Sequence, residues 1–243
     1  MSAYRILLIG RIGNGKSTVG NTILGKKFFD PQCGMCSVTG KCEWKKASRY
    51  GYDIEVTDTP GVCDTGRSDD GVEMEIAKCV ATMVPGPDAI CFVIRGSERF
   101  TKEEMDAYEN FKTIFGQEMT KYLILVFTRV TQEEFQEALQ NKKKPPPPTF
   151  LKLLEEAGNR FVCFSNDLTN KSSTEQEAIR LLQRVVDLKI QNNGSYYSDD
   201  LVKWFDHEVT KEAEKTGHSV DKIKEELIKA KNPGLSVKGC TVM

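Results

Sequence analysis

The chain has 243 residues, a length that suits one large domain with an appendage. Its 34 Lys and Arg nearly balance its 35 Asp and Glu. Because this net charge does not favour binding to a polyanion, we expect no nucleic-acid partner. The longest apolar runs, at residues 89–94 and 122–127, are far shorter than the roughly 18 residues that a membrane-spanning helix needs. Because the chain reaches Gly10 without an apolar signal segment, we expect a cytoplasmic protein.

Eight cysteines in a cytoplasmic protein are expected to be reduced thiols. Cys33, Cys36 and Cys42 include the C-x2-C spacing that forms half of many zinc sites. A second C-x2-C pair is missing, and the two histidines, His207 and His218, stand far from these cysteines. The sequence therefore favours free thiols over a zinc site.

Short apolar or β-branched runs alternate along the chain with stretches that have helical spacing. The predicted strands are residues 4–9, 52–57, 89–94, 122–127 and 161–164. The predicted helices are residues 17–24, 72–83, 101–115, 150–157 and 174–190. This alternation predicts an α/β fold, with a mostly parallel sheet and helices on both faces.

Three further segments depart from this alternation. Residues 39–47 alternate in polarity and predict an edge strand that pairs with residues 52–57 across a turn at Gly51. Residues 142–148 (KKKPPPP) predict a loop, and we favour an exposed spacer over a ligand for an aromatic-lined module. Beyond residue 198 the chain is highly charged, and its apolar residues predict one or two amphipathic helices docked on the domain or on a partner. Those apolar residues are Leu201, Trp204, Phe205, Val209, Val220, Ile223 and Leu227.

A phosphate-binding motif follows the first predicted strand. Residues 10–17 read GRIGNGKS and fit the pattern G-x4-G-K-[ST], with a strand before it and a helix after it. Backbone N–H groups of such a loop surround phosphate oxygens, Lys16 reaches the β and γ phosphates, and the Ser17 hydroxyl can bind Mg²⁺. The predicted phosphate-binding residues of this loop are Arg11, Ile12, Gly13, Asn14, Gly15, Lys16, Ser17 and Thr18.

A second motif, DTPG at residues 58–61, follows another predicted strand. We expect Asp58 to hold Mg²⁺ through water and the Gly61 N–H to meet the γ-phosphate, so that triphosphate orders the loop and diphosphate releases it. Thr39, or Ser37 beside it, is a candidate second hydroxyl on the metal, and an ordinary strand-edge threonine is the alternative.

Together, the ordered motifs resemble the GIMAP family, the immunity-associated GTPases related to septins and chloroplast-import GTPases. The motifs are GRIGNGKSTVGNTILG from Gly10, CSVT at 36–39, DTPG at 58–61, RFTKEE at 99–104, FTR at 127–129 and NNGSYY at 192–197. The resemblance implies a septin-like P-loop GTPase fold, binding of GTP and GDP with Mg²⁺, and homodimers or oligomers in the GTP state. The resemblance covers roughly residues 4–206. We therefore expect a G domain (1–206), and the charge and apolar spacing beyond it predict a charged amphipathic helical extension (207–232) and a flexible tail (233–243).

The resemblance assigns base binding to Thr128, Arg129 and Asn166. The family pattern is similar to T-R-x-D, and this chain has Thr131 where the pattern has the aspartate that accepts hydrogen bonds from guanine. Loss of that charge-assisted interaction costs roughly 1.5–3 kcal/mol of discrimination between guanine and other bases. Asp167 is an alternative source of the carboxylate. The sequence therefore leaves open whether guanine specificity survives.

Hydrolysis is expected to be slow, because Val62 follows the DTPG motif where small GTPases position a glutamine for the attacking water. Within the family motif at 99–104, Arg99 could act in trans as an arginine finger across a dimer, and an interface arginine is the equal alternative.

The last four residues, Cys240 to Met243, fit a C-a-a-X prenylation motif of the farnesyl type, although Thr241 is not aliphatic. A single chain attached to Cys240 gives only reversible membrane contact. The sequence thus predicts a slow GTPase switch that associates reversibly with membranes. The alternatives are a non-hydrolysing nucleotide-bound scaffold and an NTPase of relaxed base specificity.

Overall fold

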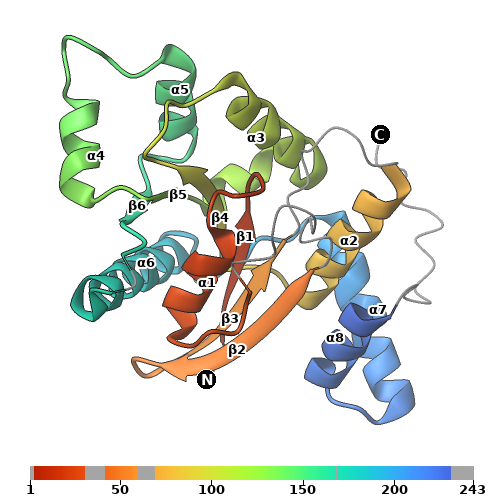
Figure 1. Cartoon of the computed structure of the whole chain (residues 1–243). Helices are drawn as coiled ribbons and strands as arrows, with labels where there is room; N and C mark the ends of the chain where they lie inside the picture. The colour runs from red at the N-terminus through yellow and green to blue at the C-terminus, as the bar shows by residue number, and fades with distance from the viewer. Residues whose placement is uncertain (1–2, 31–41, 60–68, 168, 231–243) are drawn as a thin grey trace.

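A computed structural model gives the structure of residues 3–30, 42–59, 69–167 and 169–230. A six-stranded sheet lies at its centre in the order β2-β3-β1-β4-β5-β6, with helices on both sides (Figure 1). The strands are β1 Tyr4–Ile9, β2 Glu43–Arg49, β3 Tyr52–Asp58, β4 Ala89–Arg95, β5 Leu123–Thr128 and β6 Phe161–Phe164. The helices are α1 Lys16–Leu24, α2 Asp69–Thr82, α3 Lys102–Phe115, η1 Gln117–Tyr122, α4 Gln132–Leu139, α5 Pro148–Glu156, α6 Lys171–Gln191, α7 Asp200–Thr216 and α8 Val220–Lys229.

Strand pairing brings the ends of β1 and β3 together. β1 is parallel to both β3 and β4, and only β2 runs antiparallel to its neighbour. In this register Leu8 faces Asp58 on one side and Cys91 on the other. Because parallel strands end at the same edge, the loop after β1 lies beside the carboxylate that ends β3.

Two apolar cores cover the two faces of the sheet. Ile6 and Leu8 of β1 pack with side chains of α1 and α6 on one face. Leu7 and Ile9 point to the other face, where α2, α3, α5 and α7 supply most of the helical side chains. Strands that are buried on both faces explain why the predicted runs were apolar throughout. The predicted α/β fold with a mostly parallel sheet is confirmed.

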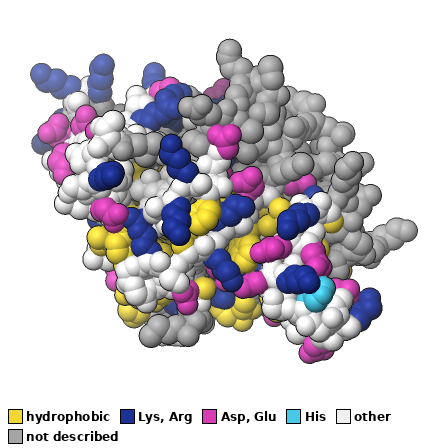
Figure 2. Space-filling view, turned by 60° about the horizontal axis from the view of Figure 1, so that its bottom comes forward, with side chains coloured by type: hydrophobic (Ala, Val, Ile, Leu, Met, Phe, Trp, Pro, Cys, Tyr) yellow, Lys and Arg dark blue, Asp and Glu magenta, His cyan; other side chains and the backbone are white. Residues whose placement is uncertain are grey.

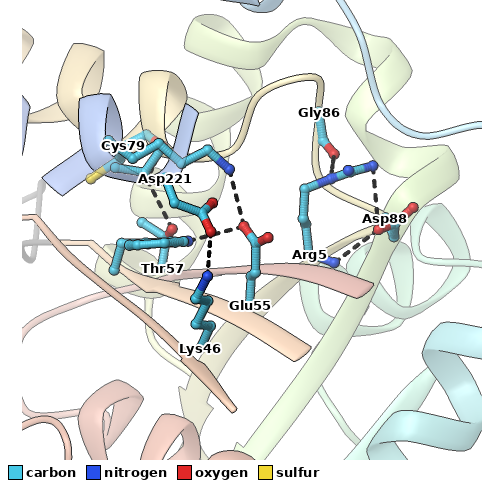
Figure 3. A network of polar contacts seen from close by, with 11 residues as sticks. Arg5, Lys46, Glu55, Thr57, Cys79, Gly86, Asp88 and Asp221 are labelled. Atoms are coloured by element: carbon cyan, nitrogen blue, oxygen red, sulfur yellow. Dashed lines mark hydrogen bonds and ion pairs between the residues drawn. The ribbon is translucent and has the colours of Figure 1, made fainter. Parts of the chain in front are cut away.

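Helices α7 and α8 form a pair beside β2 and α2 (Figure 1). Two ion pairs fix α8 to the sheet. Asp221 pairs with Lys46 of β2 (Figure 3). The Lys224 ammonium lies 3.1 Å from the Glu55 carboxylate of β3. In the same view, Arg5 pairs with the buried Asp88. The predicted boundary at residue 206 falls inside α7, since that helix continues to Thr216.

The observed elements add two helices that the sequence did not predict, α4 and η1. The predicted proline-rich loop at 142–148 ends one residue early, because Pro148 is the first residue of α5. Proline suits that position, since the N–H it lacks would have no partner within the helix. The edge strand β2 ends at Arg49, two residues beyond its predicted end at residue 47. Residues 39–41 of the predicted strand lie outside the described part.

Charges of both signs lie on the face of the molecule that Figure 2 shows. Figure 2 shows one face, on which Lys, Arg, Asp and Glu side chains are interspersed and apolar side chains lie between them. None of the helices in the described ranges combines the length and the apolar character that a membrane span requires. The four cysteines of the described part, Cys42, Cys79, Cys91 and Cys163, are buried free thiols. Cys33 and Cys36 lie outside the described residues.

Candidate functional site

The loop between β1 and α1 packs closely against β4, and a glycine makes this close approach possible. Gly10 has a φ of +138°, and a Cβ at this position would come within 2.4 Å of the Val93 carbonyl oxygen. Gly13 and Gly15 also have positive φ, at 81° and 92°. Such a backbone turns successive N–H groups into one concavity, which is the geometry that binds phosphate oxygens.

Lys16 begins α1 and stretches back across this loop. Its ammonium donates to the carbonyl oxygens of Gly10 at 3.0 Å and Arg11 at 3.1 Å. The residue is only 7% exposed. The charge is therefore buried and held by backbone oxygens of the phosphate loop.

Ser17 and Asp58 join the two motifs of the site. The Ser17 hydroxyl lies 2.6 Å from Asp58 Oδ2. Burial raises the pKa of Asp58 to about 6, although Lys16 and the Ser17 hydrogen bond act in the opposite direction. Asp58 Oδ1 is buried and has no hydrogen-bond partner among the described residues. A hydroxyl beside a carboxylate with one oxygen unused is a donor set that fits Mg²⁺, which prefers oxygen ligands and keeps several waters.

Thr59 fixes the start of the DTPG motif to the end of β1. Its hydroxyl donates to the Leu8 carbonyl oxygen at 2.8 Å, and its N–H points to the same oxygen at 3.2 Å. The predicted residues Thr39 (with Ser37) and Gly61 lie outside the described residues, as does Cys240.

The predicted base-binding residues lie beside the phosphate loop. The buried Thr128 hydroxyl donates to the Asn14 carbonyl oxygen at 2.7 Å. Asn166 reaches the same loop, since its amide nitrogen lies 3.2 Å from the position that a Cβ on Gly15 would take. Arg129 and Asn166 both have a φ of 58°, so each sits in a sharp left-handed turn at the end of β5 or β6. The fold thus brings Thr128, Arg129 and Asn166 to one edge with the phosphate loop.

Residues 4–216 match the model of the AIG1 family. The chain belongs to the AIG1 family. The match ends where α7 ends, and it confirms the resemblance to immunity-associated GTPases that the ordered motifs indicated. Helix α7 is therefore part of the family's common sequence, whereas α8 lies beyond the matched range.

Known relatives and structures agree with this assignment. The AIG1-family chain is 36% identical to immune-associated nucleotide-binding protein 9 of Arabidopsis thaliana over 86% of this chain and 60% of that protein. It is 32% identical to protein 7 of the same series over 88% of this chain and 68% of that protein. The chain therefore spans about 60% of the length of the first of these relatives.

Among solved structures, Toc33 from Arabidopsis thaliana in complex with GDP and Mg²⁺ has the same fold. The TM-score is 0.58 at 16% identity, over 79% of this chain and 86% of Toc33. Era in complex with MgGDPNP and 16S ribosomal RNA nucleotides gives a TM-score of 0.52. At such identities the likeness shows the fold, and the predicted P-loop GTPase fold is confirmed at that level.

Glu104 is a site residue of the AIG1-family chain that the sequence did not single out. Its two carboxylate oxygens each lie 3.2 Å from the Asn14 amide nitrogen, which also donates to the Val93 carbonyl oxygen at 2.8 Å. Burial raises the pKa of Glu104, and the bond from Asn14 lowers it. The signal lay in the helical spacing of α3, because Glu104 shares the buried face with Ala107, Tyr108 and Phe111.

Thr131 has a structural role that was not predicted from the sequence. It is the N-cap of α4: its hydroxyl accepts from the Glu134 N–H at 3.2 Å and donates to the Glu134 carboxylate at 3.0 Å. Thr-x-x-Glu is the sequence of a capping box, so the signal was present at residues 131–134. A hydroxyl bound in this way is a poor substitute for the aspartate that reads guanine.

Arg99 lies apart from these contacts, on the exposed segment between β4 and α3. It lines a pocket that is also bounded by α4 and by the segment before α5. Its predicted role requires a second copy of the chain.

Proposed function

We propose that this AIG1-family protein is a guanine-nucleotide-dependent switch that binds GTP and GDP with Mg²⁺ and hydrolyses GTP slowly. One observation carries the proposal: the Ser17 hydroxyl and the Asp58 carboxylate lie 2.6 Å apart, with one carboxylate oxygen unused, beside a glycine-rich loop whose carbonyl oxygens hold the Lys16 ammonium. Ser17, Asp58 and the loop are the parts that a nucleoside triphosphate with its metal requires.

Each part has a separate task in binding. The N–H groups of the turned loop and the Lys16 ammonium bind the phosphates, and this binding exchanges the Gly10 and Arg11 carbonyl partners of Lys16 for phosphate oxygens. Ser17 and Asp58 would hold Mg²⁺, which when bound neutralises charge on the β and γ phosphates. Thr128 and Asn166 border the base because they lie against Asn14 and Gly15.

The relatives support the nucleotide and the assembly. The similar proteins of Arabidopsis thaliana are named immune-associated nucleotide-binding proteins. Toc33 has been crystallised with Mg²⁺ and GMPPNP as well as with GDP. Dimerisation is important for the GTPase activity of the chloroplast translocon components atToc33 and psToc159. For the present chain we infer that the GTP state forms a homodimer or oligomer, in which Arg99 of one copy serves the site of the other.

The cellular setting is a further part of the proposal, and the prenylation-like motif at residues 240–243 supports it. The proposal places the protein in the cytoplasm, with prenylation of Cys240 giving reversible contact with membranes. Reversible attachment suits a switch, because nucleotide-controlled assembly can add a second anchoring chain and strengthen membrane binding.

The test is equilibrium binding of GTP, GDP and ATP by calorimetry in the presence of Mg²⁺, with light scattering on the same samples. We expect micromolar or tighter GTP binding, weaker ATP binding, and an increase in mass with GTP alone. Lys16→Ala should abolish binding, whereas Lys27→Ala, at an exposed lysine of the same region, should leave it unchanged. Equal affinity of the two variants for GTP would contradict the proposal.

A further inference from the structure

The structure contains an apolar pocket of about 600 Å³, and none of the phosphate-binding residues lines it. It opens between the β4–α3 segment, α4 and the proline-rich segment before α5. This volume falls within the range of about 300–1,000 Å³ that is typical of small-molecule sites. The apolar lining residues are Ile94, Phe100, Phe127, Phe135, Ala138, Leu139, Pro145, Pro146, Pro147 and Phe150.

Aromatic rings give the pocket a firm wall. The Phe127 and Phe135 rings stack with centroids 4.1 Å apart, and Phe150 meets Phe127 at 5.7 Å and Phe100 at 5.3 Å. Phe127, Phe135 and Phe150 are buried, so they are held by the core behind them. The pocket is therefore built by the packed domain and does not depend on side chains that stand free in solvent.

The prolines form the opposite wall and limit what can bind. Pro145, Pro146 and Pro147 have no N–H groups, and the N–H of Gly96 already donates to the Thr128 carbonyl oxygen at 2.8 Å. A peptide in this pocket would find few donors for its carbonyl oxygens, and buried carbonyls without partners are costly. A hydrocarbon chain needs no such donors.

Three cationic side chains belong to the lining of the pocket. Arg95, Arg99 and Lys144 line it together with a single carboxylate, Glu98, which is paired with Arg95 at 2.7 Å. Within the described ranges, Arg99 and Lys144 form no ion pair, and the buried Arg95 Nε has no hydrogen-bond partner. The lining thus has an excess of positive charge, which complements an anion.

We propose that this pocket binds a single-chain amphiphilic anion, such as a long-chain carboxylate, with its hydrocarbon chain among the phenylalanine and proline rings and its anionic head at Arg95, Arg99 and Lys144. This site is separate from the nucleotide phosphate site. It also gives the proline-rich run, for which the sequence predicts an exposed spacer, an additional role as a wall of the pocket.

The test is calorimetric titration of the nucleotide-free 243-residue chain with dodecanoate, kept below the concentration at which dodecanoate forms micelles. Saturable binding with a stoichiometry of one is expected. Octanoate should bind more weakly, by roughly threefold to fourfold for each methylene lost from the buried chain. Dodecyltrimethylammonium, which has the same chain and a cationic head, should not bind. Absence of saturable dodecanoate binding, or equal binding of the cationic amphiphile, would overturn the proposal.

Matched variants locate the site. Ala138→Trp fills the pocket from α4 and should weaken dodecanoate binding by more than tenfold, whereas Glu137→Trp, at the exposed neighbouring position, should not. Lys144→Glu should weaken binding about fivefold, and Lys143→Glu, outside the lining, should have little effect. If each pair of variants behaves alike, dodecanoate binds elsewhere and the proposal is wrong.

Two further arms separate this proposal from its alternatives. Vesicles of phosphatidylserine and phosphatidylcholine test whether the protein binds a membrane surface in place of a single hydrocarbon chain. Binding to vesicles without binding to dodecanoate would indicate a membrane surface and would overturn the proposal. Titration of GTP into the Ala138→Trp variant checks the nucleotide site independently. Normal GTP affinity with loss of dodecanoate binding is the expected combination.

Discussion

At the scale of single residues, the bond between Glu104 and Asn14 connects α3 to the phosphate loop. The two residues are 90 positions apart in the sequence, and both are buried. Asn14 in turn accepts the Thr128 hydroxyl through its carbonyl oxygen, so one loop residue links the phosphate motif to α3 and to the base side. Changes at Glu104 should therefore affect both stability and nucleotide affinity.

We predict that Glu104→Ala lowers the free energy of unfolding by about 2 kcal/mol, because the Asn14 amide loses a charge-assisted partner in a buried place. GTP affinity should fall in the same variant. Glu103→Ala, at the exposed neighbouring position, should have a much smaller effect on the unfolding free energy. Urea denaturation of the two variants checks this, and equal effects would show that the Glu104 contact has no stabilising role.

The pH dependence of stability offers a second test of the same group. Burial raises the pKa of Glu104 in the folded state above its ordinary 4.5, so the folded protein holds the proton more tightly than the unfolded chain. The part of the stability linked to this proton is fully present below the ordinary pKa and is lost as the pH rises through the raised value. Glu104→Gln should remove that part of the pH dependence. Parallel pH profiles of the variant and the wild type would contradict the assignment.

Thr131 offers a prediction on base specificity. Aspartate is also a good N-cap residue, so Thr131→Asp should keep α4 intact while it adds a carboxylate to the base side. We expect the preference for GTP over ATP to rise about tenfold or more, from an interaction of roughly 1.5–3 kcal/mol. Thr131→Ser keeps the cap without the charge and should leave the preference unchanged. Competition binding measures both, and an unaltered ratio in Thr131→Asp would mean that other groups read the base.

At the scale of elements, α8 depends on a buried ion pair. Glu55 of β3 accepts from the Lys224 ammonium at 3.1 Å and from the Trp44 indole N–H at 3.0 Å. The Lys224 ammonium also lies 5.3 Å from the centre of the Trp44 ring. Burial lowers the pKa of Lys224, and Glu55 acts in the opposite direction. Removal of one partner would leave the other charge poorly compensated.

We predict that Lys224→Ala lowers the free energy of unfolding by roughly 3 kcal/mol and frees the amides of α8 to exchange with solvent. Lys229→Ala removes a lysine from the exposed side of the same helix and should cost less than about 0.5 kcal/mol. Denaturation and hydrogen exchange test this together. Protected α8 amides in Lys224→Ala would show that the Lys224–Glu55 pair is not needed to hold the helix, and that the buried Ile223 and Leu227 and the Asp221–Lys46 pair are sufficient.

The elements also show how far the sequence could predict the structure. The strands and longer helices were predictable because their apolar periods are long, and the phosphate loop because its residues are contiguous. Helix α4 was missed because it is short and buries only Phe135, so its signal was the capping box alone. The hydrogen bond between Glu104 and Asn14 could not be predicted from the sequence, because helical spacing indicates that a residue is buried but not which residue it contacts.

At the scale of the whole molecule, three features meet at one edge of the sheet. The phosphate loop follows β1, and Asp58 is the last residue of β3. Thr128 is the last residue of β5, Asn166 follows β6, and the apolar pocket lies at the ends of β4 and β5. The Gly96–Thr128 bond at 2.8 Å ties the segment that carries Arg99 to the base side. A second copy that faces this edge would therefore meet the nucleotide, Arg99 and the pocket rim at once.

This arrangement leads to a prediction about turnover. If Arg99 acts across a dimer, GTP turnover per chain should rise with protein concentration, because the second copy supplies the charge that stabilises the transition state. Arg99→Ala should lose the concentration-dependent part, about tenfold or more at high protein concentration, and keep GTP binding. Lys102→Ala, at the first residue of α3, is the matched control and should retain it. Wild-type turnover that stays low at every concentration, with GTP still driving assembly, would instead identify a nucleotide-bound scaffold, since assembly would then proceed without the chemistry that Arg99 is proposed to serve.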